Sequence, residues 1–336
     1  MRQMARMRRG AMTAALLAAA MTGSLMTGCT SGGDAIDDGR GNNQIPGPSQ
    51  ETEEGRTQSP IPPASAGSVL AVKIDNVRAA RPQTGLEAAD IVYAEQVEGG
   101  LSRLMAVYAS KLPKVVGPVR SARESDLELL RQFDEPTLAF SGAQHKLLPL
   151  INKAPLNAHP PGKASGNAYY RGTGKSAPHN LYLRPQRLAA SSPGSAALTT
   201  GFHFGTAPAG GSPETSRTVR FPAARFTFTW SESRQRWLVA MDGTPTVTTD
   251  GNTVAPATVV VQYVKVRKSK YHDVLGSNSP YTETVGSGTA KVLRDGRVFD
   301  VDWARPSATD GTEFTTADGA PMNFAKGQVW VVFAKA

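Results

Sequence analysis

The chain has 336 residues, of which 37 are Lys or Arg and 28 are Asp or Glu, and it contains a single cysteine. One cysteine excludes an internal disulfide framework. Residues 1–28 hold four arginines and no acid, so the remainder has 33 basic and 28 acidic residues and a charge of +5. This mild excess favours an anionic partner only weakly. Because no nucleic-acid motif is present, we expect no nucleic-acid partner.

Basic and then apolar residues dominate the first 28 positions. Four arginines within residues 1–9 are followed by the apolar run AMTAALLAAAMT at 11–22. This pattern predicts a secretory signal peptide, and the run is too short for a good transmembrane helix. Because the lone Cys29 follows, the stretch resembles a bacterial lipobox. The resemblance implies cleavage before Cys29 and lipidation of Cys29. The alternative is a chance cysteine in an ordinary signal.

A lipid on Cys29 would anchor an exported protein to the outer face of the bacterial cytoplasmic membrane, which makes the membrane a partner. Residues 30–67 contain no aromatic residue and are rich in Gly, Pro, Ser and acids. Such a composition cannot bury enough surface to order itself. We therefore expect a signal peptide at 1–28 and a disordered tether at 29–67.

The pattern from 68 to 205 predicts a mixed α/β domain. Expected strands lie at 68–75, 90–97, 102–110, 115–119 and 137–142. The second and third are joined by a hairpin-like connection at Glu98-Gly99-Gly100. An amphipathic helix should follow residue 120, and a short helix interrupted by Pro149 should lie near 143–151. The long Pro- and Gly-rich segment at 152–180 predicts a loop of functional use or disorder.

Beyond a Ser-, Gly- and Pro-rich stretch near 191–216, apolar residues recur at every second position. Runs such as RFTFTW at 225–230 alternate strictly, and KVLRDGRVFDVDW places Asp295-Gly296 between two alternating runs. Asp-Gly in this position is a strong hairpin signal. We expect residues 216–336 to form a mainly antiparallel β domain, a sandwich or partly open barrel, so the whole chain is α+β.

The stretch VGPVRSARESDLELL at 116–130 places two arginines where a helix should begin. Ser121 lies three residues before Glu124, which predicts a capping box with Ser121 as the N-cap. Arg120 and Arg123 could then join free backbone N–H groups in binding a phosphate, pyrophosphate or carboxylate. The alternative is that both arginines pair with nearby acids such as Asp75, Asp90, Glu95 or Glu98.

Three long stretches resemble the YerB-like lipoprotein family. They are the segment from ARPQTGLEAADIVYAEQV to RSARESDLEL, the segment KSAPHNLYLRPQRL at 175–188, and GSGTAKVLRDGRVFDVDWAR with GQVWVVF near the end. The likeness spans about residues 70–336. It implies an exported, lipid-anchored protein of two domains, and it implies no activity. Matching positions with possible roles are Glu95, Glu98, Arg103, Arg120, Ser121, Arg123, His179 and Asn180.

These positions divide into two candidate sets. Ligand-binding candidates are Arg103, Arg120, Ser121, Arg123 and Asn180. Candidates for acid–base catalysis are Glu95, Glu98 and His179. If Glu95 faces inward it needs a cation, and Arg103 across the hairpin is the nearest one by sequence. An ion-pair scaffold is the structural alternative.

No metal or cofactor is expected, because the five histidines show no metal-ligand spacing. Lys265, Arg267, Lys268 and Lys270 follow an apolar strand and could meet an anionic wall polymer or lipid headgroups, or could simply form a solvated edge.

The leading hypothesis is therefore a membrane-anchored extracytoplasmic protein of the cell envelope that binds an anionic ligand as a binding or accessory protein. One alternative is an envelope enzyme, a hydrolase or transferase, acting on a phosphate- or glycan-containing substrate. Another is a scaffold for a protein partner. The sequence leaves open whether the protein is an enzyme.

Overall fold

The computed structural model describes residues 67–336, except 165, 190 and 273–275. The predicted signal peptide, the lipidation site Cys29 and the predicted tether up to residue 66 lie outside these residues. The described residues belong to one compact unit. Within them, no helix is long and apolar enough to cross a membrane.

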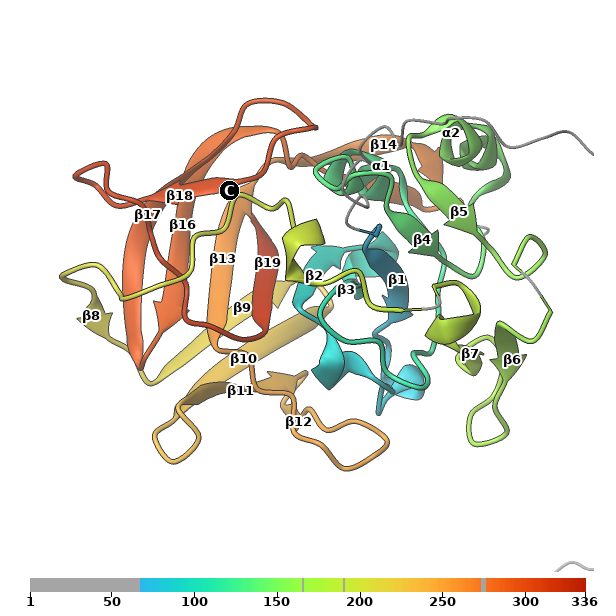
Figure 1. Ribbon diagram of the computed structural model, residues 1–336, viewed down its shortest axis with the longest axis horizontal. Helices are drawn as coiled ribbons and strands as arrows, with labels where there is room; N and C mark the ends of the chain where they lie inside the picture. The colour runs from blue at the N-terminus through green and yellow to red at the C-terminus, as the bar shows by residue number, and fades with distance from the viewer. Residues whose placement is uncertain (1–66, 165, 190, 273–275) are drawn as a thin grey trace, which may run out of the picture. The chain divides into compact units, whose positions relative to one another are not determined.

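A large mixed sheet runs through the described part of the chain (Figure 1). In spatial order its main path is β18 (Glu313–Thr315), β17 (Arg297–Arg305), β16 (Gly286–Arg294), β13 (Thr258–Val264), β19 (Val329–Lys335), β2 (Ile91–Gln96), β3 (Ser102–Tyr108), β1 (Leu70–Asp75), β4 (Thr137–Ala139) and β5 (Asn157–His159). The short strand β8 (Ser212–Pro213) pairs with β17.

Strands from both predicted domains meet in the middle of this sheet. In Figure 1 the red and orange strands of the C-terminal half reach the blue and cyan strands of the N-terminal half at β19 and β2. These two strands pair in parallel, with Val329 opposite Ile91. β19 is also parallel to β13, so the C-terminal half is not wholly antiparallel. The predicted boundary near 205–216 is therefore crossed by one hydrogen-bonded sheet.

Four strands form a second sheet that packs on one face of the large one. They are β9 (Ser216–Phe221), β10 (Ala224–Ser231), β11 (Arg236–Met241) and β12 (Thr244–Pro245). Alternate residues of β10 point inward, so Phe226 and Phe228 pack edge-on against Trp330 of β19. These aromatic residues pack with Val92 and Leu104 from the N-terminal half, so both halves of the chain share one hydrophobic core.

Short helices and hairpins cover the rest of the large sheet. Helix α1 (Glu124–Leu130) packs Leu129 and Leu130 against the face that carries Met105 and Val107, and α2 (Leu148–Lys153) lies in the same core. The 3-10 helices are η1 (Arg78–Ala80), η2 (Leu86–Ala88), η3 (Glu98–Gly100), η4 (His145–Leu147), η5 (Pro185–Arg187) and η6 (Ser195–Ala197). Two separate hairpins pair β6 (Tyr169–Arg171) with β7 (Leu181–Leu183) and β14 (Val266–His272) with β15 (Asn278–Thr282).

The predicted α+β class is thus confirmed only in part, because the described residues are mostly β and their two α-helices have seven and six residues. The expected strand at 115–119 is wrong. This segment makes isolated bridges to Ile74, Thr84 and Leu183 instead, because its partners belong to three different segments. The expected hairpin at Asp295-Gly296 is confirmed by the pairing of β16 with β17, and both residues have positive φ.

Candidate functional site

A cavity of about 420 Å³ lies where β1 ends and β3 begins, and we call it the candidate cavity. Its walls come from the end of β1, the start of β3, the segment before α1 and the β14–β15 hairpin. Four of the predicted ligand-binding residues line it: Arg103, Arg120, Ser121 and Arg123. Glu98 lines it as well, together with Tyr271, His272 and Ser279 from the hairpin.

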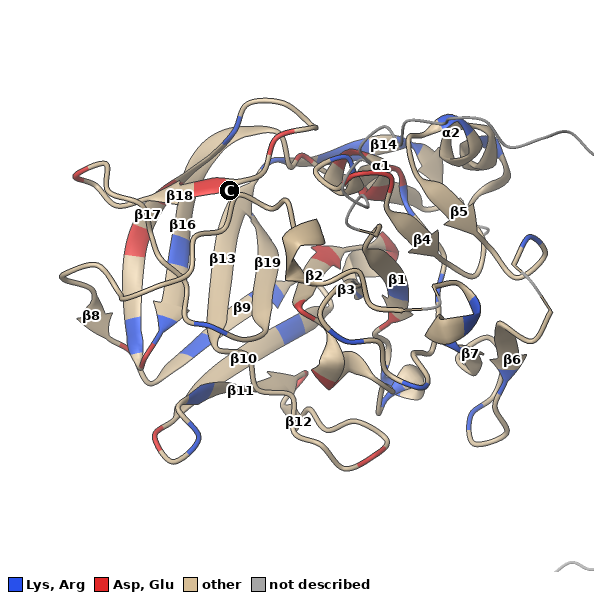
Figure 2. Ribbon diagram, viewed as in Figure 1, with Lys and Arg blue, Asp and Glu red and all other residues tan. Residues whose placement is uncertain are grey.

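The β14–β15 hairpin reaches this place through contacts with α1 and with η3. Ser269 donates to Glu124, Tyr281 donates to Glu128 at 2.7 Å, and Ser279 donates to Glu98. Figure 2 shows the basic residues of β14 alongside the acidic residues of α1. Arg267 of β14 is paired with Glu283 at 3.0 Å and lies over the ring of Tyr281. The C-terminal half therefore forms one wall of a cavity whose arginines belong to the N-terminal half.

Arg123 is held by an acid. Its Nε and Nη2 donate to the two carboxylate oxygens of Glu98 at 2.7 and 2.6 Å, and its Nη1 donates to Ala122 O at 3.0 Å. Burial alone would raise the pKa of Glu98, but the hydrogen bonds and charge of Arg123, with the Ser279 hydroxyl, lower it to about 2. Arg123 and Glu98 thus form a structural ion pair, which is the alternative that the sequence left open.

The predicted N-cap at Ser121 is wrong. Helix α1 begins at Glu124 with Arg123 as the N-cap, and Asp126 Oδ2 accepts the Arg123 backbone N–H at 2.7 Å. The Ala122 N–H is also occupied, by Gly142 O at 3.0 Å. Asp126, three residues after Arg123, supplies the carboxylate that a capping box requires, so the helix starts later than Ser121 and Glu124 suggest. The backbone N–H groups of Ala122 and Arg123 are therefore not free for an anion.

Arg103 is the buried cation of the candidate cavity. It is 7% exposed, and its Nη1 donates to Ser121 O at 3.2 Å. Its Nε is buried and has no hydrogen-bond partner in the described part of the chain. Burial lowers the pKa of Arg103 to about 10, and the nearby charge of Arg123 acts in the same direction. A buried guanidinium that lines a cavity with so few partners is a position where a ligand oxygen would be strongly stabilised.

Arg120 and His179 meet at the buried carboxylate of Asp75, which the sequence offered only as a possible partner of the two arginines. Asp75 Oδ2 lies 2.8 Å from His179 Nδ1 and 3.3 Å from Arg120 Nε, and Asp75 is 1% exposed. The Arg120 Nε contact lacks hydrogen-bond geometry, so this nitrogen is also without a hydrogen-bond partner among the described residues. Asp75 closes β1 directly opposite Arg103 of β3. The sequence alone does not show that Asp75 and Arg103 are neighbours, because this depends on how β1 and β3 pair.

A second cavity of about 510 Å³ adjoins the first, and we call it the loop cavity. Arg120 and Ser121 line both cavities, and Ser141 and Arg171 are added in the second. Asn180 does not line either one. It accepts from Arg171 Nη1 at 2.7 Å and donates to Gly172 O at 2.9 Å. The structure therefore places Asn180 behind Arg171, where it orients that side chain.

Glu95 lies in a buried charge network away from these cavities. Lys73, fully buried, donates to Glu95 and, at 2.6 Å, to Asp126, while Ser125 donates to Glu95 at 3.0 Å. Burial raises the pKa of Glu95, although Lys73 opposes the rise. The expectation that Arg103 would be the cation of Glu95 is wrong. Arg103 is its cross-strand neighbour, but Lys73 makes the contact.

No group of three or more His, Cys, Asp or Glu side chains that could hold a metal ion occurs among the described residues. The candidate cavity contains two guanidinium groups, Arg103 and Arg120, that have hydrogen-bonding capacity to spare. A histidine–aspartate pair, His179 with Asp75, lies beside them.

Comparisons with known proteins agree over most of the chain. Residues 57–198 match the N-terminal domain of "Protein of unknown function (DUF3048)", and residues 217–331 match its C-terminal domain. The chain is 26% identical over 273 residues to "Putative lipoprotein YerB" of Bacillus subtilis (strain 168), which covers 78% of this chain and 80% of that protein. The fold is similar to the crystal structure of the YerB protein from Bacillus subtilis, with a TM-score of 0.67 at 22% identity, over 80% of this chain and 91% of that one. The two domain matches and the relative together confirm the resemblance, and the chain belongs to the DUF3048 family of YerB-like proteins.

Proposed function

We propose that the protein is an exported, lipid-anchored binding protein of the cell envelope that recognises a phosphate-bearing ligand in the candidate cavity. The observation that carries this proposal is Arg103, a buried guanidinium that lines the cavity and makes one hydrogen bond and no ion pair among the described residues. Arg120, on the border with the loop cavity, supplies a second partly unpaired guanidinium. The lipobox at Cys29 and the name of the Bacillus subtilis relative support the exported, anchored location.

Energetics favour a ligand over a purely structural role for Arg103. Removing a charge from water is costly unless good hydrogen bonds replace those of water. Arg123 meets this requirement through Glu98, whereas Arg103 makes one hydrogen bond, to Ser121 O, and no ion pair among the described residues. A phosphate or pyrophosphate can accept two parallel N–H groups from a guanidinium. Binding of such an anion would supply the partners that Arg103 lacks.

Arg103→Met is expected to weaken anion binding strongly while leaving the ligand-free protein at least as stable as wild type. Each charged hydrogen bond contributes about 1.5–3 kcal/mol, so the loss predicts a fall in pyrophosphate affinity of about tenfold or more. The measurement is calorimetric titration of the full chain, in a neutral detergent, with pyrophosphate and with inorganic phosphate. Thermal unfolding of each variant without ligand gives the second readout.

Two further variants complete that experiment. Arg103→Lys keeps the charge without the bidentate geometry and should bind with intermediate affinity. Arg131→Gln, which changes an exposed arginine at the other end of α1, should bind as wild type does. Pyrophosphate affinity that survives Arg103→Met would refute the proposal. A ligand-free Arg103→Met protein that is strongly destabilised would instead assign Arg103 a structural role.

The His179–Asp75 pair favours one alternative, an envelope hydrolase acting on a phosphate ester. A carboxylate at 2.8 Å orients the imidazole, as acid–base catalysis requires. If the protein is such an enzyme, His179→Gln should lower kcat for bis(p-nitrophenyl) phosphate by about a hundredfold or more, with a much smaller change in KM. The assay is release of p-nitrophenolate by the full chain. No turnover by wild type, or turnover that His179→Gln retains, would eliminate this alternative.

A further inference from the structure

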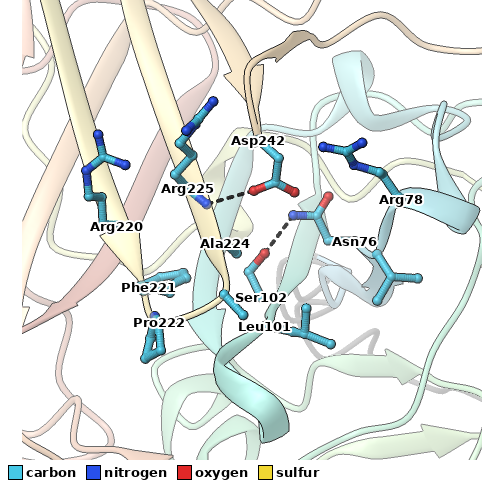
Figure 3. A pocket seen from close by; sticks show the side chains of 12 residues that line it. Asn76, Arg78, Leu101, Ser102, Arg220, Phe221, Pro222, Ala224, Arg225 and Asp242 are labelled. Atoms are coloured by element: carbon cyan, nitrogen blue, oxygen red, sulfur yellow. Dashed lines mark hydrogen bonds between the residues drawn. The ribbon is translucent and has the colours of Figure 1, made fainter.

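A third cavity, of about 590 Å³, lies between the end of the large sheet and the β9–β10 turn, and we call it the arginine cavity. Figure 3 shows that its charged and apolar residues are separated. Arg220 and Arg225 extend in the same direction from β9 and β10, and Arg78 approaches from the opposite wall with Asp242 between. Leu101, Phe221 and Pro222 lie together at the other end.

The three arginines of this cavity lack partners of their own. No hydrogen bond or ion pair involves the guanidinium groups of Arg78, Arg220 and Arg225 within the described residues. The one carboxylate nearby, Asp242, accepts the Arg225 backbone N–H at 2.8 Å and pairs with Arg81 at 2.9 Å. Its charge is therefore already balanced by a fourth arginine.

Strand pairing places two of these cations directly opposite one another. Arg225 of β10 is the cross-strand partner of Arg220 of β9, next to the turn. Like charges in this position destabilise a sheet. Both side chains are exposed, and an anion bound between them would offset that repulsion, so the pair is suited to binding an anion.

The arginine cavity and the candidate cavity meet at the end of the sheet. Val77 and Leu101 line both. Ser102 lines the first and Arg103 the second, and consecutive residues of a strand point to opposite faces. The two cavities therefore lie on opposite faces, with an apolar rim between them. Leu101, which is 38% exposed, lies on this rim.

We propose that the arginine cavity is a second anion subsite, and that one linear polymer with phosphate groups separated by uncharged units occupies it together with the candidate cavity. The inference rests on the proposed function of the candidate cavity. An apolar rim between two clusters of arginines matches a chain in which charged and uncharged units alternate, such as a polyol phosphate. Inorganic polyphosphate would place charge against Val77 and Leu101. Two weak subsites on one chain bind far more tightly than either alone.

The test compares a monomer with polymers on the full chain in a neutral detergent. The probes are glycerol 3-phosphate, poly(glycerol phosphate) and inorganic polyphosphate of matched charge. The double variant Arg220→Gln/Arg225→Gln should lower the affinity for poly(glycerol phosphate) at least tenfold and leave glycerol 3-phosphate binding in the candidate cavity unchanged. Arg234→Gln, an exposed arginine in the neighbouring β10–β11 turn, is the matched control and should have no effect.

The outcomes separate the two proposals. If the monomer binds in an Arg103-dependent way but the double variant holds poly(glycerol phosphate) as wild type does, the second subsite is refuted and the candidate site stands. If polyphosphate bound as tightly as poly(glycerol phosphate), the inference that the ligand alternates charged and uncharged units would be refuted. Absence of any Arg103-dependent binding, by monomer or polymer, would refute the proposed function itself.

Discussion

Lys73→Met should destabilise the folded protein by about 3–5 kcal/mol, because it leaves two buried carboxylates without their cation. Lys73 is fully buried and contacts both Glu95 and Asp126, which are 4% and 0% exposed. Asp126 also accepts the Arg123 backbone N–H, so the network fixes the segment that borders the candidate cavity. Urea denaturation at neutral pH, compared with wild type, measures the effect.

The destabilisation should shrink as the pH falls. Burial already raises the pKa of Glu95 in the folded protein, and Lys73 opposes this rise, so its removal raises that pKa further. A carboxyl whose folded-state pKa is raised binds its proton more tightly in the folded than in the unfolded chain. The stability that this proton binding contributes is fully present below the ordinary carboxyl pKa of 4.5. It is lost as the pH rises through the folded-state pKa. The variant should therefore lie closer to wild type at pH 5 than at pH 8.

Lys291→Met is the matched control for this experiment. Lys291 also pairs with a carboxylate, that of Asp300, but the Asp300 side chain is 80% exposed. A surface pair of this kind contributes about 0–1 kcal/mol. Lys73→Met would contradict our interpretation if it cost no more than this control, or if its cost were the same at both pH values.

Local pattern was enough to predict much of the strand content and little of its arrangement. The apolar runs at 68–75, 90–97 and 102–110 became β1, β2 and β3 because short apolar runs of that length fit a buried strand. The parallel pairing of β2 with β19 could not be predicted, because it joins residues more than 200 positions apart and no local period specifies a neighbour.

For the candidate site, too, sequence predicted several of the residues but not their contacts. The arginines at 103, 120 and 123 were predicted as anion binders or as partners of acids, and the structure assigns Arg123 to Glu98 and brings Arg120 to Asp75. Which acid meets which cation depends on strand register and on loop packing, which sequence does not display. Asp75 and His179, 104 positions apart, are adjacent only in the folded chain. A charged residue at the end of an apolar strand is the one signal that could have singled out Asp75.

The arginine at the end of β17 joins distant parts of the chain. Arg305 is fully buried and donates to the carbonyl oxygens of Glu128 and Leu129, at the end of α1, at 3.0 and 3.3 Å. It also donates to Thr284 Oγ1 at 2.8 Å and to the carbonyls of Ala308 and Asp310 at 2.6 and 2.9 Å. Glu128 O also accepts from the Arg131 N–H at 3.3 Å and Leu129 O from Gln132 Nε2 at 2.7 Å, so Arg305 adds a second donor to each carbonyl and joins the end of α1 to β17.

Arg305→Met should therefore destabilise the protein by about 3–5 kcal/mol, since five hydrogen bonds from a buried charged group are lost at about 1.5–3 kcal/mol each, while the second donors to Glu128 O and Leu129 O and the removal of a buried charge offset part of that cost. Arg305→Lys should recover less than half of the loss, because one ammonium group cannot reach acceptors that a planar guanidinium contacts on three sides. The control is Arg297→Met on the same strand, where an exposed arginine bonds Gly210 O and Gly211 O and should cost under about 1 kcal/mol. Urea denaturation of the three variants measures these differences. If Arg305→Lys proved as stable as wild type, charge alone would explain the role of Arg305, and the argument from its five acceptors would fail.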